Sequence, residues 1–155
     1  MATHPFSIDE RVRWSDVDAA GIIFYGAYVR FFEIAETELF RAAGLTYGMI
    51  IDQYDTLLPR ARVHAEFYAP ARLDDALRVY AYVAKVGTRS LTLQFDVVLV
   101  GATRLIAEGQ LVLVATDRER LVSKPLPEGF LTRLAPFVAS IEATRSSLGI
   151  ARDGR

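Results

Sequence analysis

Two aspartates, followed closely by two glycines, form the segment of this sequence best suited to chemistry. Asp16 and Asp18 lie in a stretch that also holds Gly21 and Gly26, just ahead of a predicted helix that begins near Ala27. Free backbone N–H groups at a helix N-terminus can polarise a carbonyl oxygen or hold an oxyanion. A carboxylate beside them can attack a carbonyl carbon or activate water. The segment is therefore a candidate acyl-transfer centre, in which Gly26 lets a substrate approach the backbone closely.

The same spacing is also typical of an ordinary turn, in which Asp18 bonds its own backbone and Gly21 takes a positive φ. From spacing alone, both interpretations stay open. A calcium-binding loop is excluded, because counting from Asp16 puts Ala20 at the fifth position and Ala27 at the twelfth, where an acidic ligand is required. Asp16 itself is expected to be a turn or capping residue rather than a second catalytic acid.

The elements that must position this segment are predicted from hydrophobic periodicity. A helix over 27–43 has an apolar face wide enough for it to be wrapped on most sides. The residues of that face are Tyr28, Phe31, Phe32, Ile34, Ala35, Leu39, Phe40 and Ala42. Four later runs alternate apolar and polar residues, as strands of an antiparallel meander do. These runs cover residues 61–67, 77–83, 91–99 and 107–115.

A further strand within 6–14 and a C-terminal helix over 128–148, kinked or split at Pro136, complete the predicted order. A long apolar helix needs a surface to lie on, and a curved antiparallel sheet supplies one. We therefore expect an α+β fold, with residues 1–155 forming one domain whose ends, 1–4 and 146–155, are loose.

The composition excludes several classes of protein. The chain has 155 residues, 52% of them hydrophobic, a net charge of −1 and no cysteine, which excludes disulfide scaffolds, thiolate zinc sites and cysteine nucleophiles. We expect no nucleic-acid partner, no membrane span and no cofactor, and with only His4 and His64 no histidine-based metal site. The first ten residues lack the features of a signal peptide, so a cytoplasmic protein is expected.

Two blocks of sequence resemble the 4-hydroxybenzoyl-CoA thioesterase family of hot-dog-fold acyl-CoA thioesterases. The first block, at 16–28, reads DVDAAGIIFYGAY and resembles the family's D-x-D-x-x-G motif with its following aromatic residues. The second, at 68–75, reads YAPARLDD and resembles the segment before the family's third strand. The resemblance extends over roughly residues 8–125, and Asp74 and Asp75 are expected to form a turn there.

The resemblance implies a curved antiparallel sheet around one long helix, and hydrolysis of an acyl-CoA thioester to a carboxylic acid and free CoA. It assigns the catalytic carboxylate to Asp18 and the amide that polarises the thioester carbonyl to Tyr25. Family members join sheets edge to edge into dimers, often paired into tetramers, with active sites at the dimer interface. We therefore expect a homodimer or homotetramer.

The same family resemblance predicts which residues contact the substrate. Gly26, Phe24 and Tyr28 are expected to line the acyl site, and Arg89 with Ser90 to bind the phosphates of CoA. A second basic group consists of Arg118, Arg120 and Lys124. The acyl group stays open between short-chain aliphatic and aryl, and a carrier-protein ester or a non-catalytic acyl-CoA-binding protein are the alternatives.

Two other polar positions have less specific interpretations. Glu33 lies on the polar side of the predicted helix, where it can pair with a neighbouring charge or face a partner subunit. His64 alternates with Arg62 and Glu66 on one face of a predicted strand, which indicates a solvated face.

Overall fold

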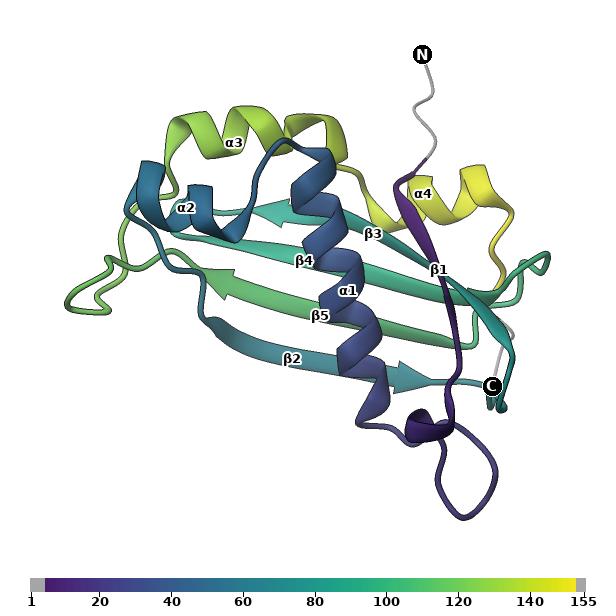
Figure 1. The fold of residues 1–155 in the computed structure, drawn as a ribbon. Helices are drawn as coiled ribbons and strands as arrows, with labels where there is room; N and C mark the ends of the chain where they lie inside the picture. Colours follow the sequence, from purple (N-terminus) through teal and green to yellow (C-terminus); the bar gives the residue numbers. More distant parts are fainter. Residues whose placement is uncertain (1–4, 153–155) are drawn as a thin grey trace.

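A five-stranded antiparallel sheet crossed by one long helix organises this chain (Figure 1). The computed structural model describes residues 5–152. Its strands are β1 (Ser7–Arg11), β2 (Arg60–Phe67), β3 (Ala76–Val86), β4 (Ser90–Leu99) and β5 (Ala107–Val114). Its helices are α1 (Ala27–Ala42), α2 (Tyr47–Tyr54), α3 (Glu128–Leu134) and α4 (Ile141–Leu148), with 3₁₀ turns η1 (Trp14–Asp16) and η2 (Ala135–Phe137). The expected α+β class is confirmed.

The strands lie in the order β1-β3-β4-β5-β2. The prediction that four consecutive strands form a meander is wrong for β2. Only β3, β4 and β5 are neighbours in the sheet in the order in which they occur in the chain. β2 pairs with β5 at the far edge, with Val63 opposite Leu111. The connection 68–75 is longer than a hairpin turn and carries the chain across the end of the sheet to β3. Among residues 5–152, no strand pairs with the outer edge of β2.

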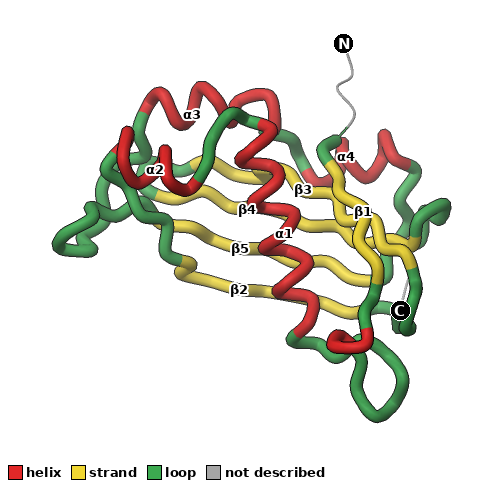
Figure 2. The backbone as a smooth tube through the Cα atoms, viewed as in Figure 1, coloured by secondary structure: helices red, strands yellow, loops and turns green. Residues whose placement is uncertain are grey.

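The central helix α1 lies across one face of the sheet and is buried along most of its length (Figure 2). Phe32 stacks on Phe95 of β4 with 4.9 Å between ring centroids. Gly109 of β5 lies directly beneath, and a Cβ there would overlap the Phe32 ring. A glycine in mid-strand thus allows the helix to approach the sheet closely. The expected packing of a long helix on a sheet is confirmed, but α1 is not wrapped on most sides: Val29, Glu33 and Arg41 on its other face are exposed.

Part of the opposite face of the sheet is covered by α4. Because Phe95 faces α1, its neighbour Asp96 points away from α1. Both Asp96 oxygens accept hydrogen bonds from Arg145 of α4, at 2.6 and 3.2 Å. The Tyr82 hydroxyl donates to Asp96 as well, and Arg145 also reaches Glu108. This network fixes α4 against the sheet.

Two expectations for the ends of elements can be compared directly. The C-terminal helix is split near Pro136 into α3, η2 and α4, as predicted. The expected loose tail from Ser146 differs from the structure, because α4 continues to Leu148 and Ala151 exchanges hydrogen bonds with residues 103–105. Residues 1–4 and 153–155 lie outside the described residues. No helix in the described part of the chain is long and apolar enough to cross a membrane.

Candidate active site

Asp16 is the anchor of the loop that leads into α1. Its side chain is buried, and the guanidinium of Arg30 donates to both carboxylate oxygens at 2.8 and 2.7 Å. The Arg13 amide donates to Oδ2 at 2.8 Å, and the Asp16 carbonyl accepts from the Phe24 amide at 2.9 Å. Asp16 therefore has a structural role, consistent with the expected turn or capping residue.

Asp18, two residues later, lies in a different environment. It is exposed and forms the turn that its spacing allows: Oδ1 accepts from the Ala20 amide at 2.8 Å, and Gly21 has φ +74°. Its other carboxylate oxygen, Oδ2, accepts no hydrogen bond from residues 5–152. Asp18 can therefore form the turn through Oδ1 and still offer Oδ2 to a substrate or a water molecule.

Two backbone amides are available where α1 begins. The amides of Ala27, Tyr28 and Val29 each donate to a carbonyl three residues earlier, at 3.0–3.3 Å. The amides of Tyr25 and Gly26 have no acceptor within the described residues. These two donors lie at the positive end of the helix dipole, where a developing negative charge is favoured.

Asp18, Tyr25, Phe24 and Tyr28 all border one cavity of about 490 Å³, which we call the proximal cavity. Its walls are otherwise apolar apart from Tyr68. The remaining lining residues are Ile22, Ile23, Phe67, Tyr68, Ala69 and Pro70. An aromatic cavity with one carboxylate at its border suits the acyl part of a ligand.

The two sequence blocks that resemble the thioesterase family meet at this cavity. Ile22 of the first block bridges to Arg72 of the second, and the Ile23 amide donates to the Ala71 carbonyl at 2.9 Å. Phe67 and Tyr68 were not predicted as site residues. Tyr68 opens the second block, which was a usable signal, whereas Phe67 reaches the cavity only because β2 lies beside α1.

Tyr28 forms the wall between α1 and β2. Its ring lies 5.1 Å from that of Phe67, and burial raises the pKa of Tyr28 to about 12. The phenol therefore stays neutral at physiological pH. Gly26 precedes α1 with an ordinary φ, and a Cβ there would lie 2.7 Å from the Phe24 ring. Its lack of a side chain leaves room for Phe24 beside the cavity.

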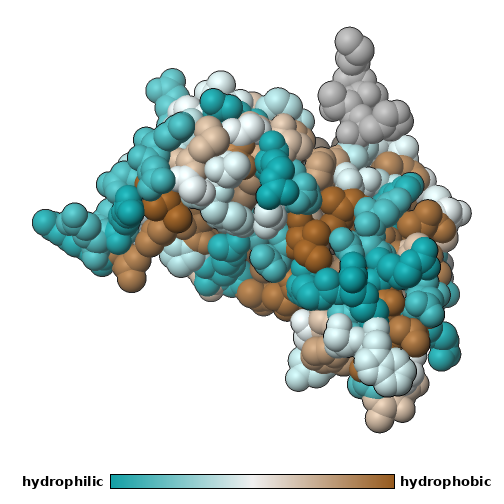
Figure 3. Space-filling model, in the orientation of Figure 1, coloured by the Kyte–Doolittle hydropathy of each residue, from teal (hydrophilic) through white to brown (hydrophobic). Residues whose placement is uncertain are grey.

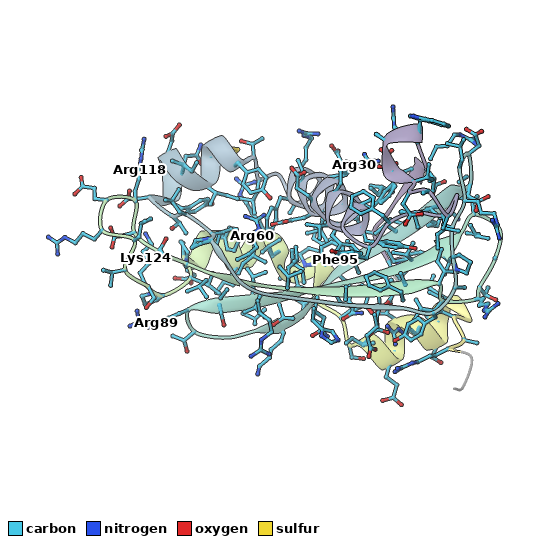
Figure 4. The ribbon with its side chains drawn as sticks, turned by 90° about the horizontal axis from the view of Figure 1, so that it is seen from below. Arg30, Arg60, Arg89, Phe95, Arg118 and Lys124 are labelled. Carbon is cyan, nitrogen blue, oxygen red and sulfur yellow. The ribbon has the colours of Figure 1, made fainter. Side chains whose placement is uncertain are left out.

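Arg89 and Ser90 are not brought to this cavity within one chain. Ser90 begins β4, whereas Phe67 of the cavity is level with Val97, about 23 Å further along at 3.3 Å per residue. Arg89 donates to the Ser123 carbonyl at 2.7 Å. Figure 4 shows Arg89, Arg118 and Lys124 together at one end of the molecule, away from Arg30. Their assignment to CoA stays a prediction that requires a second chain.

The other polar candidates lie apart from Asp18. Glu33 is exposed on α1 and borders a different cavity. His64 is exposed on β2, as expected for a solvated face. Asp74, with φ +68°, and Asp75, whose carboxylate accepts from the Arg72 amide at 2.8 Å, form the turn that precedes β3, as expected.

Comparison with known sequences places the chain in a family. Residues 12–134 match the Thioesterase-like superfamily. The chain is 30% identical over 132 residues to an acyl-CoA thioester hydrolase, YbgC, of Escherichia coli, covering 84% of this chain and 96% of that protein. It is 28% identical over 135 residues to a 1,4-dihydroxy-2-naphthoyl-CoA hydrolase of Synechococcus, covering 83% and 89% of the two chains.

Solved structures show the same fold. A mutant 4-hydroxybenzoyl-CoA thioesterase in complex with 4-hydroxybenzoyl-CoA superimposes with a TM-score of 0.77 at 21% identity, covering 85% of this chain and 99% of that one. A 1,4-dihydroxy-2-naphthoyl-CoA thioesterase from Synechocystis gives 0.77 at 22% identity, covering 84% and 95%. The expected hot-dog fold is thereby confirmed. With its sequence match over most of its length, this chain belongs to the Thioesterase-like superfamily of hot-dog-fold thioester hydrolases.

Proposed function

We propose that this chain hydrolyses acyl-CoA thioesters to a carboxylic acid and free CoA, using Asp18 and the Tyr25 amide. The observation that carries the proposal is the meeting, at one apolar cavity, of an available carboxylate oxygen and unpartnered helix amides. The names of the relatives support acyl-CoA esters as the substrate class. The acyl group fits the aromatic walls, so the thioester carbonyl lies where α1 begins.

In the proposed reaction, the thioester carbonyl oxygen accepts a hydrogen bond from the Tyr25 amide. As the tetrahedral intermediate forms, this donor stabilises the negative charge on that oxygen. Asp18 either removes a proton from the attacking water or attacks the carbonyl carbon itself, giving an anhydride that water then opens. In both routes the C–S bond breaks and CoA leaves with a proton. The water oxygen enters the product acid directly in the first route, and in the second it enters whichever carbonyl of the anhydride the water attacks.

Hydrolysis in ¹⁸O-labelled water under single-turnover conditions distinguishes the two routes. Direct attack by water puts ¹⁸O into the product acid. Opening of an anhydride by attack at the Asp18 carbonyl puts the label into the Asp18 carboxylate instead, which mass spectrometry of the peptide detects.

We also propose that the site is completed by a second copy of the chain. The outer edge of β2 has no strand partner in the described part of the chain, and an open edge can pair with another strand. Val29, Val63, Phe67 and Tyr25, around this edge and the proximal cavity, are exposed apolar residues. Figure 3 shows hydrophobic surface interrupting the polar surface on the face crossed by α1. A second copy covers such residues and brings its Arg89 and Ser90 within reach of CoA.

The test measures thiol release from acetyl-, butyryl-, palmitoyl-, benzoyl- and phenylacetyl-CoA by the unmodified chain and by Asp18→Asn. We expect at least one ester to be hydrolysed and the variant to lose that activity while keeping its fold. Thiol release that persists in Asp18→Asn overturns the role of Asp18. Binding of every ester with no release by either protein leaves a non-catalytic acyl-CoA-binding protein or a carrier-bound substrate. Thiol release from the same acyl groups on acyl-carrier protein then favours the carrier-bound substrate, and no release favours the binding protein.

A further inference from the structure

Asp18 borders a second cavity in addition to the proximal cavity, and no other lining residue belongs to both. This second cavity measures about 500 Å³, and we call it the Trp14 cavity. Its lining residues are Trp14, Val17, Asp18, Ala19, Gly21 and Leu73. The candidate catalytic carboxylate therefore lies where two cavities meet, and the proposed mechanism uses only one of them.

The Trp14 cavity has two exposed apolar side chains that come from separate segments. Trp14 begins η1 and is 81% exposed, and Leu73, in the connection between β2 and β3, is 38% exposed. A tryptophan ring carries a large apolar surface and is highly buried in most proteins. Exposed apolar side chains that gather at one cavity are typical of a binding surface.

Backbone hydrogen bonds hold these two segments side by side. The Val12 amide donates to the Asp75 carbonyl at 2.9 Å, and the Val12 carbonyl accepts from the Asp74 amide at 3.0 Å. On the other flank, the buried carboxylate of Asp16 anchors η1. The backbone that carries the two exposed side chains is thereby fixed, and a preformed surface binds a ligand at a lower cost in conformational entropy.

The lining of the Trp14 cavity indicates which part of an acyl-CoA fits there. Asp18 is its only charged lining residue, so the cavity favours neither the phosphates of CoA nor a carboxylate. The Trp14 ring offers an apolar face, and its indole N–H, which donates to no group among residues 5–152, can donate to a ligand. The pantetheine arm of CoA has matching groups, because its methyl groups can pack on the ring and its amide carbonyls can accept from the N–H.

The place of the cavity agrees with the proposed path of the substrate. With the acyl group in the proximal cavity and the carbonyl at Asp18, the arm attached through sulfur continues past Asp18. Figure 4 shows Arg89 at the end of the molecule away from Arg30. Because antiparallel pairing of two β2 edges reverses the second copy, the Arg89 end of that copy lies beside the Asp18 end of the first. The thioester, the Trp14 cavity and the proposed phosphate contacts then lie at the same end of the paired copies.

We infer that the Trp14 cavity binds the pantetheine arm of the substrate, with Trp14 and Leu73 as its main contacts. The inference rests on the proposed hydrolysis of acyl-CoA esters. It gives the leaving group a binding site separate from that of the acyl group. The binding energy contributed by the arm is therefore independent of which acyl group the substrate carries.

Fluorescence tests the inference directly, because Trp14 is the only tryptophan of the chain. CoA, pantetheine, ADP, butyrate and benzoate are each titrated into the unmodified protein, with excitation at a wavelength that tyrosine does not absorb. We expect CoA and pantetheine to shift the Trp14 emission to shorter wavelength in a saturable way, since the arm displaces water from the ring. ADP, butyrate and benzoate should leave the emission unchanged, because they lack the arm.

Kinetics of Trp14→Ala provide a second measurement. KM and kcat are determined for butyryl and benzoyl thioesters of CoA, of pantetheine and of ethanethiol. For the CoA and pantetheine esters we expect KM to rise about tenfold with kcat nearly unchanged, because the arm contacts Trp14 equally in the ground state and the transition state. The ethyl thioesters lack the arm, so the variant should hydrolyse them as the unmodified chain does.

Two further substitutions control for folding and for general surface effects. Leu73→Ala should raise KM for the same esters by a smaller factor, and it retains Trp14 as the fluorescent reporter. Val138→Ala is the matched control, since Val138 is an apolar residue that is 47% exposed and lines neither cavity. It should keep the KM and the emission response of the unmodified chain. Melting temperatures of all three variants verify that each is folded.

Each alternative outcome has one meaning. An emission response to butyrate or benzoate but not to pantetheine overturns the inference and assigns the Trp14 cavity to the acyl group. No response to any ligand overturns it as well, as does an equal loss of kcat/KM for the ethyl and pantetheine esters in Trp14→Ala. Absence of thiol release from every ester contradicts the proposed hydrolase instead, and the titrations with CoA and pantetheine then still decide what the Trp14 cavity binds.

Discussion

The two faces of the sheet each carry a buried carboxylate paired with an arginine, and the pairs differ in how completely they are bonded. On the outer face, each oxygen of Asp96 accepts two hydrogen bonds, from Arg145, Tyr82 and Gln94. On the helix-covered face, Glu36 accepts from Arg60 through one oxygen and leaves the other without a partner in the described residues. The Asp96 network therefore joins more groups than the Glu36–Arg60 pair does, and it fixes their positions more closely.

The loop before α1 repeats this difference over a distance of two residues. Asp16 is buried and bonded through both oxygens, and Asp18 is exposed and bonded through one. Residue type does not separate a structural carboxylate from a candidate catalytic one. The number of carboxylate oxygens that accept hydrogen bonds from the protein separates the two kinds, and substitution of each carboxylate tests this.

The largest effects on activity and stability are expected when each of the two aspartates of the loop is replaced by asparagine in turn. Asp18→Asn should lower kcat by about 10²–10⁴-fold, as for loss of a general base, with an unchanged melting temperature. Asp16→Asn should instead lower the free energy of unfolding by about 3 kcal/mol, because Arg30 loses its charged partner. Thiol-release kinetics and urea denaturation of both variants check this. Equal effects of both substitutions on both measurements would contradict the distinction.

On the outer face, Arg145→Met should destabilise the chain by about 3 kcal/mol. It leaves the completely buried Asp96 without its main counter-charge. Burial alone lowers the pKa of Arg145, but its bonds to Asp96 and Glu108 outweigh burial and raise that pKa, so the guanidinium stays charged over the whole working range. Urea denaturation measures the loss, and kcat per folded molecule should not change. A loss of kcat without a loss of stability would show that the outer network acts on the site.

Buried tyrosines on the two faces should respond differently to alkali. Burial raises the pKa of Tyr28 to about 12, whereas burial and the Asp96 carboxylate together raise that of Tyr82 further. A raised pKa means that the unfolded chain loses the proton first, so stability present below pH 10 falls as the pH rises towards 12. Tyr28→Phe should remove on the order of 2 kcal/mol of this fall, measured by urea denaturation at pH 9–12. An unchanged pH dependence in the variant would contradict the burial of Tyr28.

A smaller effect is expected at the contact between helix and sheet. Gly109→Ala should cost about 1–3 kcal/mol, because its Cβ would overlap the Phe32 ring. Gly101→Ala is a useful comparison, since that glycine has open space around it and only its φ of +85° opposes a side chain. Gly109 has no positive φ, so a loss there reports on the overlap with Phe32 alone. No loss at position 109 would show that the Phe32 ring moves aside and that the approach of α1 does not depend on this glycine.

The sequence alone determined the helix 27–42, the strands and the split at Pro136, because periodicity and proline act over a few neighbouring residues. The resemblance of one short motif to the thioesterase family also assigned Asp18 and Tyr25 as the pair to test, whereas the spacing alone left a turn and an acyl-transfer centre both open. Helix α2 was not predicted. It is short and begins where the Thr46 side chain accepts a hydrogen bond from the Met49 amide, a local signal that could have been used.

Only the tertiary structure decided which residues distant in the chain lie next to one another. The place of β2 beside β5, the meeting of the two motif blocks and the arrival of Phe67 at the proximal cavity each join residues far apart in the chain. The same is true of the ion pair between Glu36 of α1 and Arg60 of β2, because the hydrophobic periodicity of each element gives no indication that these two residues meet. Hydrophobic pattern specifies which face of an element is buried, but the partner of that face depends on the packing of the whole chain.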